Sequence, residues 1–377
     1  MGKAQITILA FFISLTALAQ NTIRLEIKSL PVSSISGNNI YIAGSFNNWN
    51  PQNEQFKFQQ DEKENYFINL KLAPGSYEYK LTRGGWDKVE CTKSGAGIAN
   101  RILKVETNAT VEISIEGWQD QFTAKPKLST ASKNVHIIDT AFLIPQLNRK
   151  RRVWIYVPVT KPLHEIRFPV LYMHDGQNVF EDTSSFSGEW GVDEFLDSSN
   201  LKQCIVVAID NGANKRMNEY HPYDNERFGR AEGDEYVDFI VKTLKPFIDK
   251  HYQTQKNKTY IAGSSMGGLI SMYALMKYPK IFTGAGIFSP AFWTAPKIFD
   301  GIRKKSKKIK ANIFLYAGKQ EGDQMVPDML KAFQNLAAKK SKAKIKIVIR
   351  DQGKHNEATW RKEFPSGFAW MLYGQEL

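Results

Sequence analysis

Residues Gly263–Gly267 read G-S-S-M-G and fit the pattern G-x-S-x-G. A strand-like run, Lys258–Ala262, precedes them, and an apolar, helix-like stretch begins at Met266. This context predicts a strand that turns sharply into a helix, with glycines that let the backbone approach itself closely. A serine on such a strained turn presents its hydroxyl above the sheet, so we predict Ser265 as a nucleophile and Ser264 as a packing residue.

A serine nucleophile requires a histidine as general base and an acid that orients the histidine, and beyond a turn of this kind the acid comes first along the chain. His355 is the only one of six histidines that follows Ser265, and it comes after the apolar run 344–350. The first carboxylate beyond the apolar run 312–317 is Glu321. We therefore predict His355 as the base and Glu321 as the acid. The alternatives for the acid are Asp323, Asp328 and Asp351.

The oxyanion that forms during attack on a carbonyl needs two backbone N–H donors. We expect one donor from Met266, directly after the nucleophile, and the other from the loop in the sequence LYMHDGQNVF. In that loop we choose the N–H of Gln177. His174 ends a strand-like run ahead of Ser265, so we expect it to make a structural hydrogen bond.

Trp49, in GSFNNWNP, and Trp86, in RGGW, stand on expected loops of the N-terminal region. The flat indole face stacks on the C–H face of a sugar ring, and lysine and asparagine side chains bond to sugar hydroxyls. These residues therefore predict a carbohydrate-binding surface, to which Asn47 and Asn48 belong as neighbours of Trp49. The alternative is that both tryptophans are partly buried residues of the fold.

The elements that must position these residues fall into two classes. Residues 21–117 contain short strand-like segments separated by glycine, proline and asparagine, which is typical of a small all-β, immunoglobulin-like sandwich. Residues 118–130 are polar and contain one proline, so we expect a linker. Over residues 131–377 apolar strands alternate with helical stretches such as 236–252 and 266–278, which predicts an α/β domain with a mainly parallel sheet and helices on both faces.

The first 19 residues carry one lysine, an apolar stretch and a small-x-small site, and they predict a secretory signal peptide cleaved near Ala19. No other apolar run is long enough to span a bilayer, so we expect export to the periplasm or the cell exterior, without a membrane anchor. The two cysteines, Cys91 and Cys204, fall in separate predicted domains, which indicates buried free thiols. We expect no metal and no organic cofactor.

The formal net charge is +13, and lysine and arginine concentrate at 303–310 and 339–346. An anionic partner, such as an acidic polysaccharide or a nucleic acid, is one interpretation of these runs. Neither run is interleaved with aromatic residues or set in a nucleic-acid-binding motif. We therefore expect solvated surface and no nucleic-acid partner.

The segments YMHDGQNVF, IDNGANKRMNEY, GSSMGG, FSPAFW and H-N-E-x-x-W together resemble the esterase-D-like group of α/β-hydrolases. That group includes the carbohydrate esterases of family 1, which are feruloyl and acetylxylan esterases, as well as S-formylglutathione hydrolases and siderophore-lactone esterases. The resemblance runs from about Val135 to Leu377. It implies the α/β-hydrolase fold and hydrolysis of carboxylic esters through Ser265, His355 and Glu321.

Residues 39–105 resemble the starch- and glycogen-binding modules, including the module of the AMP-activated kinase regulatory subunit. The motifs G-S-F-N-N-W, Y-E-Y-K and G-G-W carry this resemblance. It implies stacking positions at Trp49 and Trp86, a hydrogen-bonding position at Lys80 and an amide position at Asn100. Related modules also act as rigid spacers beside esterase domains.

Together these features predict a secreted serine esterase that removes feruloyl or acetyl groups from an acylated polysaccharide such as xylan. Hydrolysis of a small-molecule ester, such as a siderophore trilactone, is the first alternative. A catalytically silent glycan-binding protein is the second, and the complete set of Ser265, Glu321 and His355 argues against it. The acyl group, the polymer and the oligomeric state stay open.

Overall fold

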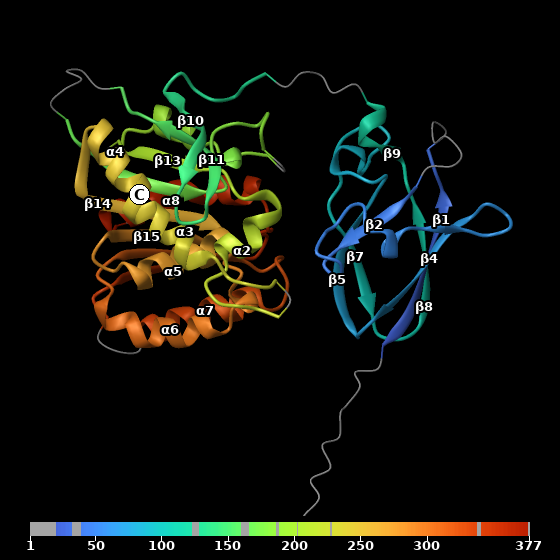
Figure 1. The fold of residues 1–377 in the computed structure, drawn as a ribbon. Coiled ribbons are helices and arrows are strands. Elements are labelled where there is room, and N and C mark those ends of the chain that lie inside the picture. Colours follow the sequence, from blue (N-terminus) through green and yellow to red (C-terminus); the bar gives the residue numbers. More distant parts are fainter. Residues whose placement is uncertain are drawn as a thin grey trace, which may run out of the picture. The chain divides into compact units, whose positions relative to one another are not determined.

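The structure, a computed structural model, describes residues 20–31, 39–122, 128–159, 166–185, 188–201, 203–226, 228–337 and 341–375. The chain forms two compact units, Met1–Pro126 and Lys127–Leu377 (Figure 1). The predicted signal peptide lies outside the described residues. Within the described ranges, no helix combines the length and the apolar character that a bilayer span requires.

The first unit is an all-β domain. Its strands form three sheets with the orders β3-β4-β1-β8, β2-β5-β7 and β6-β9. The strands are β1 (Asn21–Ser29), β2 (Tyr41–Gly44), β3 (Gln59–Gln60), β4 (Tyr66–Leu72), β5 (Gly75–Thr82), β6 (Glu90–Cys91), β7 (Arg101–Val105), β8 (Ala109–Ser114) and β9 (Gly117–Trp118). Alternate residues of β1, such as Ile23 and Leu25, are fully buried and share one core with Ile42, Leu81 and Trp118. Short 3₁₀ turns are η1 (Glu54–Phe56), η2 (Trp86–Lys88) and η3 (Gln119–Gln121).

The segment 118–130, expected to be a linker, is ordered at both ends. At its start Trp118 is fully buried and pairs with Glu90 in the sheet β6-β9. A single tryptophan in a polar stretch gives no periodic signal, which is why the sequence placed it in the linker. At its end, Ser129 and Thr130 are hydrogen-bonded to side chains of the second unit.

The second unit is built on an eight-stranded sheet with the order β10-β11-β13-β12-β14-β15-β16-β17. The strands are β10 (Val135–Ile144), β11 (Arg149–Tyr156), β12 (Phe168–His174), β13 (Ile205–Ile209), β14 (Thr254–Ser264), β15 (Phe282–Phe288), β16 (Asn312–Gly318) and β17 (Lys344–Arg350). From β13 to β17 all neighbours are parallel, whereas β10 and β11 are antiparallel. The predicted α/β fold with a mainly parallel sheet is confirmed.

Helices cover both faces of this sheet, because its central strands are apolar on both sides. Along β12, Val170 and Tyr172 belong to one core and Leu171 and Met173 to the other. The first core packs against α2 (Arg216–Tyr220), α3 (Gly233–Phe239), α4 (Lys245–His251), α5 (Met266–Lys277), α6 (Lys297–Lys305) and α7 (Met325–Ala337). The second packs against α1 (Val192–Ser198) and α8 (Glu357–Tyr373), on the opposite face (Figure 1).

Short turns complete the second unit. They are η4 (Gly176–Asn178), η5 (Ala213–Lys215), η7 (Phe292–Thr294), η8 (Ser306–Lys308) and a π-helical turn, η6 (Ile240–Leu244), between α3 and α4. The predicted helix 236–252 is thus one continuous helical run, 233–251, with a π turn just before Pro246, a residue that cannot donate to the helix ladder. Cys91 and Cys204 are buried free thiols, as predicted, and burial raises the pKa of both.

The chain enters the second unit as a short segment held by carboxylates. The Ser129 hydroxyl donates to Glu181, the Thr130 hydroxyl to Glu189 at 3.0 Å, and the Ser132 N–H to Asp193 at 2.7 Å. We call residues 129–132 and their carboxylate partners the entry clasp. Burial, together with the neighbouring Glu194, raises the pKa of Glu189 to about 7.

Candidate active site

The strand-to-helix turn predicted at Ser265 is present between β14 and α5. Ser265 has φ 56° and ψ −120°, a backbone conformation that is costly for a residue with a side chain. Its N–H donates to Phe288 O at 3.0 Å and its C=O accepts from Ala291 N–H at 3.0 Å. Ser264 is buried, whereas Ser265 is partly exposed. The turn is therefore fixed on both sides and presents Ser265 rather than its neighbour.

The two glycines of the motif are required by close packing. A Cβ atom at Gly263 would lie 2.9 Å from Cδ2 of His174 and 3.0 Å from the carbonyl carbon of Gly267. A Cβ atom at Gly267 would lie 3.3 Å from Cβ of His174 and 3.4 Å from Oδ2 of Asp175. The end of β12 thus packs against the start of α5, which brings the two expected sources of oxyanion donors together.

Glu321 and His355 meet at the carboxyl ends of β16 and β17. Oε2 of Glu321 is 2.8 Å from Nδ1 of His355, while Oε1 accepts from the Gly318 N–H at 2.7 Å and the Ser289 hydroxyl at 2.9 Å. The Glu321 side chain is 0% exposed and that of His355 is 38% exposed. A buried carboxylate that accepts from a partly exposed imidazole is the arrangement needed to orient a general base.

The alternative acids do not occupy this position. Asp323 is exposed, and Asp351 pairs with Lys319 at 2.8 Å. Asp328 lies in the first turn of α7, and neighbouring Lys331 only partly counters the rise that burial causes in its pKa. Among the described residues, no hydrogen bond joins the Ser265 hydroxyl to His355. Hydrogen bonds between catalytic groups are often long in unliganded enzymes and shorten when substrate binds.

Ser289, Trp190 and Trp360 support Glu321 and His355, and none of the three was predicted to do so from the sequence. The Ser289 hydroxyl, which donates to Glu321, accepts from Nε1 of Trp360 at 2.9 Å. The Trp360 ring lies edge-on to His355 with centroids 5.1 Å apart and stacks on Trp190 at 5.8 Å. All three supporting residues are buried. The only sequence signal is the spacing of Trp360 five residues after His355, on the helix that follows it.

The predicted oxyanion loop is held by an ion pair between buried Asp175 and partly buried Arg216. Asp175 adopts a left-handed conformation, φ 55°, directly before η4, which contains Gln177. Arg216 binds Asp175 through Nε at 2.6 Å and through a second guanidinium nitrogen at 2.8 Å, and the Asn211 amide donates to the same carboxylate. Burial alone would raise the pKa of Asp175, but the charge and hydrogen bonds of Arg216 lower it below its usual range.

The two backbone N–H groups predicted to bind the oxyanion lie at the start of α5 and in η4. The N–H of Met266 is the first of α5, so it has no acceptor within the helix. The N–H of Gln177 belongs to the turn that follows Asp175, and the Gln177 side chain accepts from the Asn211 N–H at 3.2 Å. His174 is not part of this machinery. Its Nδ1 lies 3.0 Å from the Tyr236 hydroxyl, and burial lowers its pKa to about 4, so it is a neutral structural residue.

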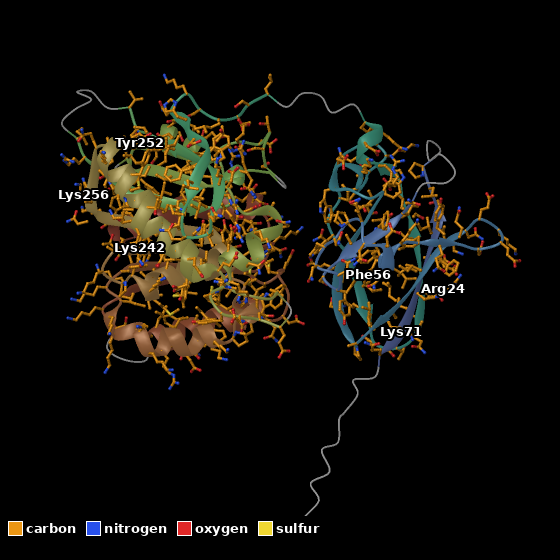
Figure 2. All side chains as sticks on the ribbon, viewed as in Figure 1. Arg24, Phe56, Lys71, Lys242, Tyr252 and Lys256 are labelled. Carbon is orange, nitrogen blue, oxygen red and sulfur yellow. The ribbon has the colours of Figure 1, made fainter. Side chains whose placement is uncertain are left out.

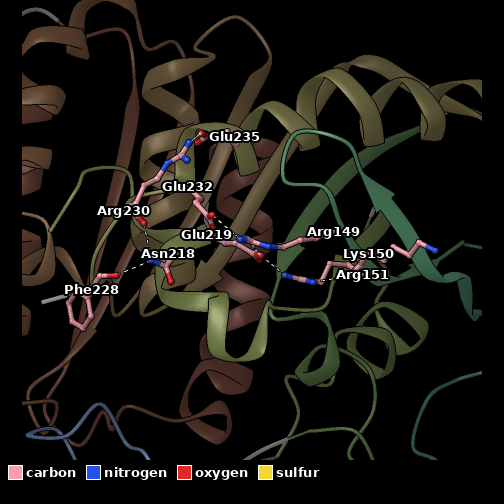
Figure 3. Close-up of polar contacts among 9 residues, drawn as sticks. All are labelled: Arg149, Lys150, Arg151, Asn218, Glu219, Phe228, Arg230, Glu232 and Glu235. Carbon is pink, nitrogen blue, oxygen red and sulfur yellow. Dashed lines mark hydrogen bonds and ion pairs between the residues drawn. The ribbon is translucent and has the colours of Figure 1, made fainter. Parts of the chain in front are cut away.

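The loop between β13 and α3, described over 211–226 and 228–232, is anchored by charged groups (Figure 3). Arg149 and Arg151 of β11 both bind Glu219 of α2, and Arg149 also binds Glu232. The Asn218 amide donates to the carbonyl oxygens of Phe228 and Arg230. Glu219 is fully buried, so its two arginine partners offset the cost of burying its charge.

The same loop fixes η7, next to the nucleophile. His221 and Asn225 both contact the Thr294 carbonyl oxygen, at 3.0 and 2.9 Å. Phe292 is buried, whereas Trp293 is 51% exposed. Ala291, which binds the Ser265 carbonyl, is only two residues from Trp293. Trp293, whose indole is exposed, therefore stands on a turn that is hydrogen-bonded to the backbone of Ser265, and the sequence analysis did not single it out.

Of the predicted sugar-binding residues, Trp49 follows β2, Lys80 lies within β5, Trp86 follows β5 and Asn100 precedes β7. The rings of Trp49 and Trp86 are 6.2 Å apart and inclined by 41°. Nζ of Lys80 donates to the Ile98 carbonyl at 2.7 Å, and the Asn100 amide donates to Glu78 at 2.9 Å. The two rings thus form a bent aromatic surface.

Asn47 was expected to face sugar, but it is buried and structural. Its side chain accepts from the Gly44 N–H at 2.8 Å and donates to the Ile42 carbonyl at 2.8 Å. These bonds close the turn in which Asn48 and Trp49 have positive φ angles. From the sequence alone, an asparagine whose side chain closes a turn cannot be distinguished from one whose side chain faces a ligand.

No group of three or more histidine, cysteine, aspartate or glutamate side chains suited to a metal ion occurs in the described residues.

Two family models match this chain and define the class of protein. The esterase family model, described as "Putative esterase", matches residues 144–371, so the chain belongs to this family. The model for the "Glycogen recognition site of AMP-activated protein kinase" matches residues 33–112, so the first unit is similar to that glycan-recognition module.

The relatives include a protein named a siderophore esterase and one named a xylanase/feruloyl esterase. The ferri-bacillibactin esterase BesA of Bacillus subtilis is 36% identical over 199 residues, covering 46% of this chain and 67% of that protein. The endo-1,4-beta-xylanase/feruloyl esterase of Xylanibacter ruminicola is 25% identical over 300 residues, covering 77% of this chain but 37% of that protein. The crystal structure of the BES protein from Bacillus cereus has a TM-score of 0.55 at 18% identity, over 67% of this chain and 100% of that one, which shows a shared fold.

Proposed function

We propose that the protein is a serine carboxylic-ester hydrolase in which Ser265 is the nucleophile, His355 the base and Glu321 the acid. The observation that carries this proposal is the strained, partly exposed Ser265 at the head of α5, combined with the hydrogen bond of 2.8 Å between Glu321 and His355. All three residues follow the carboxyl ends of strands in one sheet. Membership of the esterase family supports the same reaction class.

The mechanism follows from these positions. His355 removes the Ser265 proton as the serine oxygen attacks the ester carbonyl, and Glu321 stabilises the imidazolium that forms. The N–H groups of Met266 and Gln177 hold the oxyanion. His355 then protonates the leaving alcohol, and water repeats the sequence on the acyl-enzyme, which releases the acid and restores Ser265.

For the substrate, we propose feruloyl or other acyl esters on a polysaccharide, handled after export from the cytoplasm. The exposed indole of Trp293 near Ser265 supports an aromatic acyl group, because flat rings stack on indole. The similarity of the first unit to a glycan-recognition module supports a polysaccharide carrier. One relative is named a xylanase/feruloyl esterase.

A second candidate is hydrolysis of a siderophore ester. The relative BesA, named a ferri-bacillibactin esterase, supports it. An aromatic surface beside the nucleophile would also accept the aromatic rings of such a molecule. The paired rings of Trp49 and Trp86 on the first unit favour the polysaccharide, since a small molecule gives them no role.

A substrate panel tests the proposal. Methyl ferulate, acetylated xylan, a short acyl nitrophenyl ester and a trilactone siderophore should be offered to the wild-type protein and to Ser265→Ala, with Ser264→Ala as the matched control. We expect cleavage of methyl ferulate that falls by about 10⁴-fold or more in Ser265→Ala and persists in Ser264→Ala. Activity that survives in Ser265→Ala would contradict the mechanism, and cleavage of the trilactone alone would contradict the polysaccharide substrate.

A further inference from the structure

The oxyanion donor and the base of the candidate site come from distant strands. Gln177 belongs to η4, which follows β12, whereas His355 lies between β17 and α8. Three strands, β14, β15 and β16, separate β12 from β17 in the sheet. Neighbouring strands are about 4.8 Å apart, so the ends of β12 and β17 are about 19 Å apart. The loops beyond both strands must therefore reach toward each other, and contacts between these loops fix the distance between the oxyanion donor and the base.

One hydrogen bond joins the two loops directly. The Asn178 amide donates to Oε1 of Glu357 at 3.0 Å. Asn178 directly follows Gln177 in η4, and Glu357 is the first residue of α8, two positions after His355. We call this pair of side chains, Asn178 and Glu357, the site bridge. It connects the residue next to the oxyanion donor with the segment that carries the base.

The backbone of Asn178 is held from two directions. Its N–H donates to the Asp175 carbonyl oxygen at 2.8 Å, which closes the turn of η4. Its carbonyl oxygen accepts from the Trp190 N–H at 2.8 Å, and the Trp190 ring stacks on Trp360 of α8. A displacement of Glu357 therefore acts on η4 through the short side chain of a residue whose backbone is already fixed.

The position of Glu357 is unusual for a charged side chain. Lysines such as Lys242 and Lys256 are exposed at the surface of the second unit (Figure 2), whereas Glu357 is only 8% exposed. Glu363 of the same helix is equally buried, but Arg350 binds it through two nitrogens at 2.7 and 3.0 Å. Within the described parts of the chain, Glu357 makes no ion pair with a lysine or an arginine.

The charged groups around Glu357 come from three segments. Asp175 precedes η4, Arg216 lies in α2, and His355 lies just before α8. Burial and the charge of Asp175 raise the pKa of Glu357 above its usual range. Hydrogen bonds from its own N–H and from Asn178, and the charge of His355, act in the opposite direction. A buried carboxylate in these surroundings costs stability, which points to a role in the site.

We propose that Glu357 is a positioning residue of the esterase site and acts through Asn178. The site bridge sets the distance between the Gln177 N–H and the imidazole of His355, so that both reach the same ester carbonyl. A misplacement of about 1 Å is enough to lower a catalytic rate by about 10²-fold. This inference rests on the proposed esterase function and adds to it a residue that neither contacts the substrate nor transfers a proton.

Exchanging the two ends of the site bridge tests this role. Asn178→Asp places two carboxylates face to face, so kcat for methyl ferulate should fall by about 100-fold at pH 8 with little change in KM. Adding Glu357→Gln returns one amide and one carboxylate to the same two positions, because both substitutions preserve the size of the side chain. The double variant should recover kcat to within about fivefold of wild type.

The pH dependence of Asn178→Asp gives a readout that a purely structural role would not change. The ratio of wild-type kcat to variant kcat should be smaller at pH 6 than at pH 8. At the lower pH one of the two facing carboxylates takes up a proton and donates it in a hydrogen bond to the other. The double variant lacks the second carboxylate, so its ratio to wild type should not change in this way.

Removal of the acceptor provides a second measurement. Glu357→Ala should lower kcat by about 100-fold for methyl ferulate and for methyl acetate alike, because the bridge acts at the reacting carbonyl and not on the acyl group. Glu357→Gln keeps an acceptor oxygen and should lower kcat only about threefold. Glu363→Ala is the matched control from the same helix, and it should lower the Tm but leave kcat unchanged.

Thermal unfolding of every variant separates a loss of position from a loss of fold. Failure of Glu357→Gln to restore kcat in Asn178→Asp would overturn the site bridge, as would a kcat that follows the Tm in every variant. Unchanged kcat in Glu357→Ala, with activity that still requires Ser265, would overturn the bridge alone. Activity that survives in Ser265→Ala would overturn the esterase mechanism, and the bridge with it.

Discussion

At the scale of single residues, the two oxygens of Glu321 have different partners. Oε1 accepts from the Gly318 N–H and the Ser289 hydroxyl, which leaves Oε2 for His355. Trp360 in turn holds the Ser289 hydroxyl. The carboxylate is therefore oriented by donors that are themselves buried or hydrogen-bonded, and it in turn orients the imidazole of His355.

Replacing Glu321 by glutamine tests this role. An amide at this position offers a neutral acceptor and brings an N–H₂ group toward either Gly318 or His355, so the imidazolium loses its stabilising charge. We expect kcat to fall by about 10³–10⁴-fold with little change in KM. Asp323→Asn is the matched control and should retain full activity. The reverse pattern would assign the acid to Asp323.

Trp293 provides a test of the acyl group. Replacement by alanine removes the exposed indole near Ser265 and should raise KM for methyl ferulate about five- to tenfold, by the loss of one aromatic stacking contact. KM for an acetyl ester should be unchanged, because a methyl group gains little from stacking. Trp293→Phe should restore most of the affinity. Equal changes in KM for the two esters would exclude stacking of the acyl group on this residue.

Residues with a fixed place along the chain were predictable, and those defined by long-range contacts were not. Ser265, Glu321 and His355 each follow a recognisable strand, and their order along the chain limits the candidates. Ser289 and Arg216 act through residues 32 and 41 positions away. A single sequence contains no signal for such pairs. The same limit explains why Asn47 was expected to face sugar although its hydrogen bonds turn it inward.

At the scale of elements, the alternation of strands and helices gave the fold class but not the ends of the domains. Central strands such as β12 are apolar on both sides, which a window of sequence detects. The strand β9 has two residues, and it pairs with a partner of equal length far along the chain. A strand of two residues shows no periodicity in the sequence, so Trp118 of β9 was assigned to the expected linker 118–130.

The entry clasp predicts a stability that depends on pH. Burial and Glu194 raise the pKa of Glu189 from its ordinary value of 4.5 to about 7. Folding therefore takes up a proton between these values, and the stabilising effect is present at low pH and lost as the pH rises through 7. Glu189→Gln removes the charge and should raise the Tm at pH 8, by about 2–4 °C for each kcal/mol gained, and change it little at pH 5.

Scanning calorimetry of wild type and Glu189→Gln at pH 5, 6, 7 and 8 measures this difference. Glu181→Gln is the control from the same clasp, because hydrogen bonds hold the pKa of Glu181 below its usual range although burial acts against them. That variant should lose stability at pH 8 instead of gaining it. A Tm difference for Glu189→Gln that is the same at every pH would contradict a titrating Glu189.

At the scale of the whole molecule, the chain joins a module similar to a glycan-recognition domain to an esterase-family domain. A tether of this kind raises the local concentration of the catalytic unit at a polymer that the module binds, without any new contact at the nucleophile. The benefit exists only for a polymeric or insoluble substrate. Loss of binding by the first unit should therefore slow hydrolysis of a polymeric substrate and leave hydrolysis of a small soluble ester unchanged.

Trp49→Ala combined with Trp86→Ala should leave kcat/KM for methyl ferulate unchanged and lower the rate of acyl release from insoluble feruloylated xylan about tenfold or more. The reason is that the paired rings are the flat surface on which a sugar would stack. Replacement of the exposed Lys88 by alanine serves as the control on the same turn. Undiminished release from the insoluble polymer would make the module a spacer.

The entry clasp also determines where mechanical load would enter the catalytic unit. If the module is attached to a solid and the medium pulls on the rest of the chain, tension passes along the backbone to Ser129 and Thr130 before it reaches β10. The bonds to Glu181 and Glu189 are then the first contacts of the catalytic unit to carry that force. Glu189 directly precedes Trp190, which stacks on Trp360 beside His355, so a force large enough to open the clasp acts next to the base.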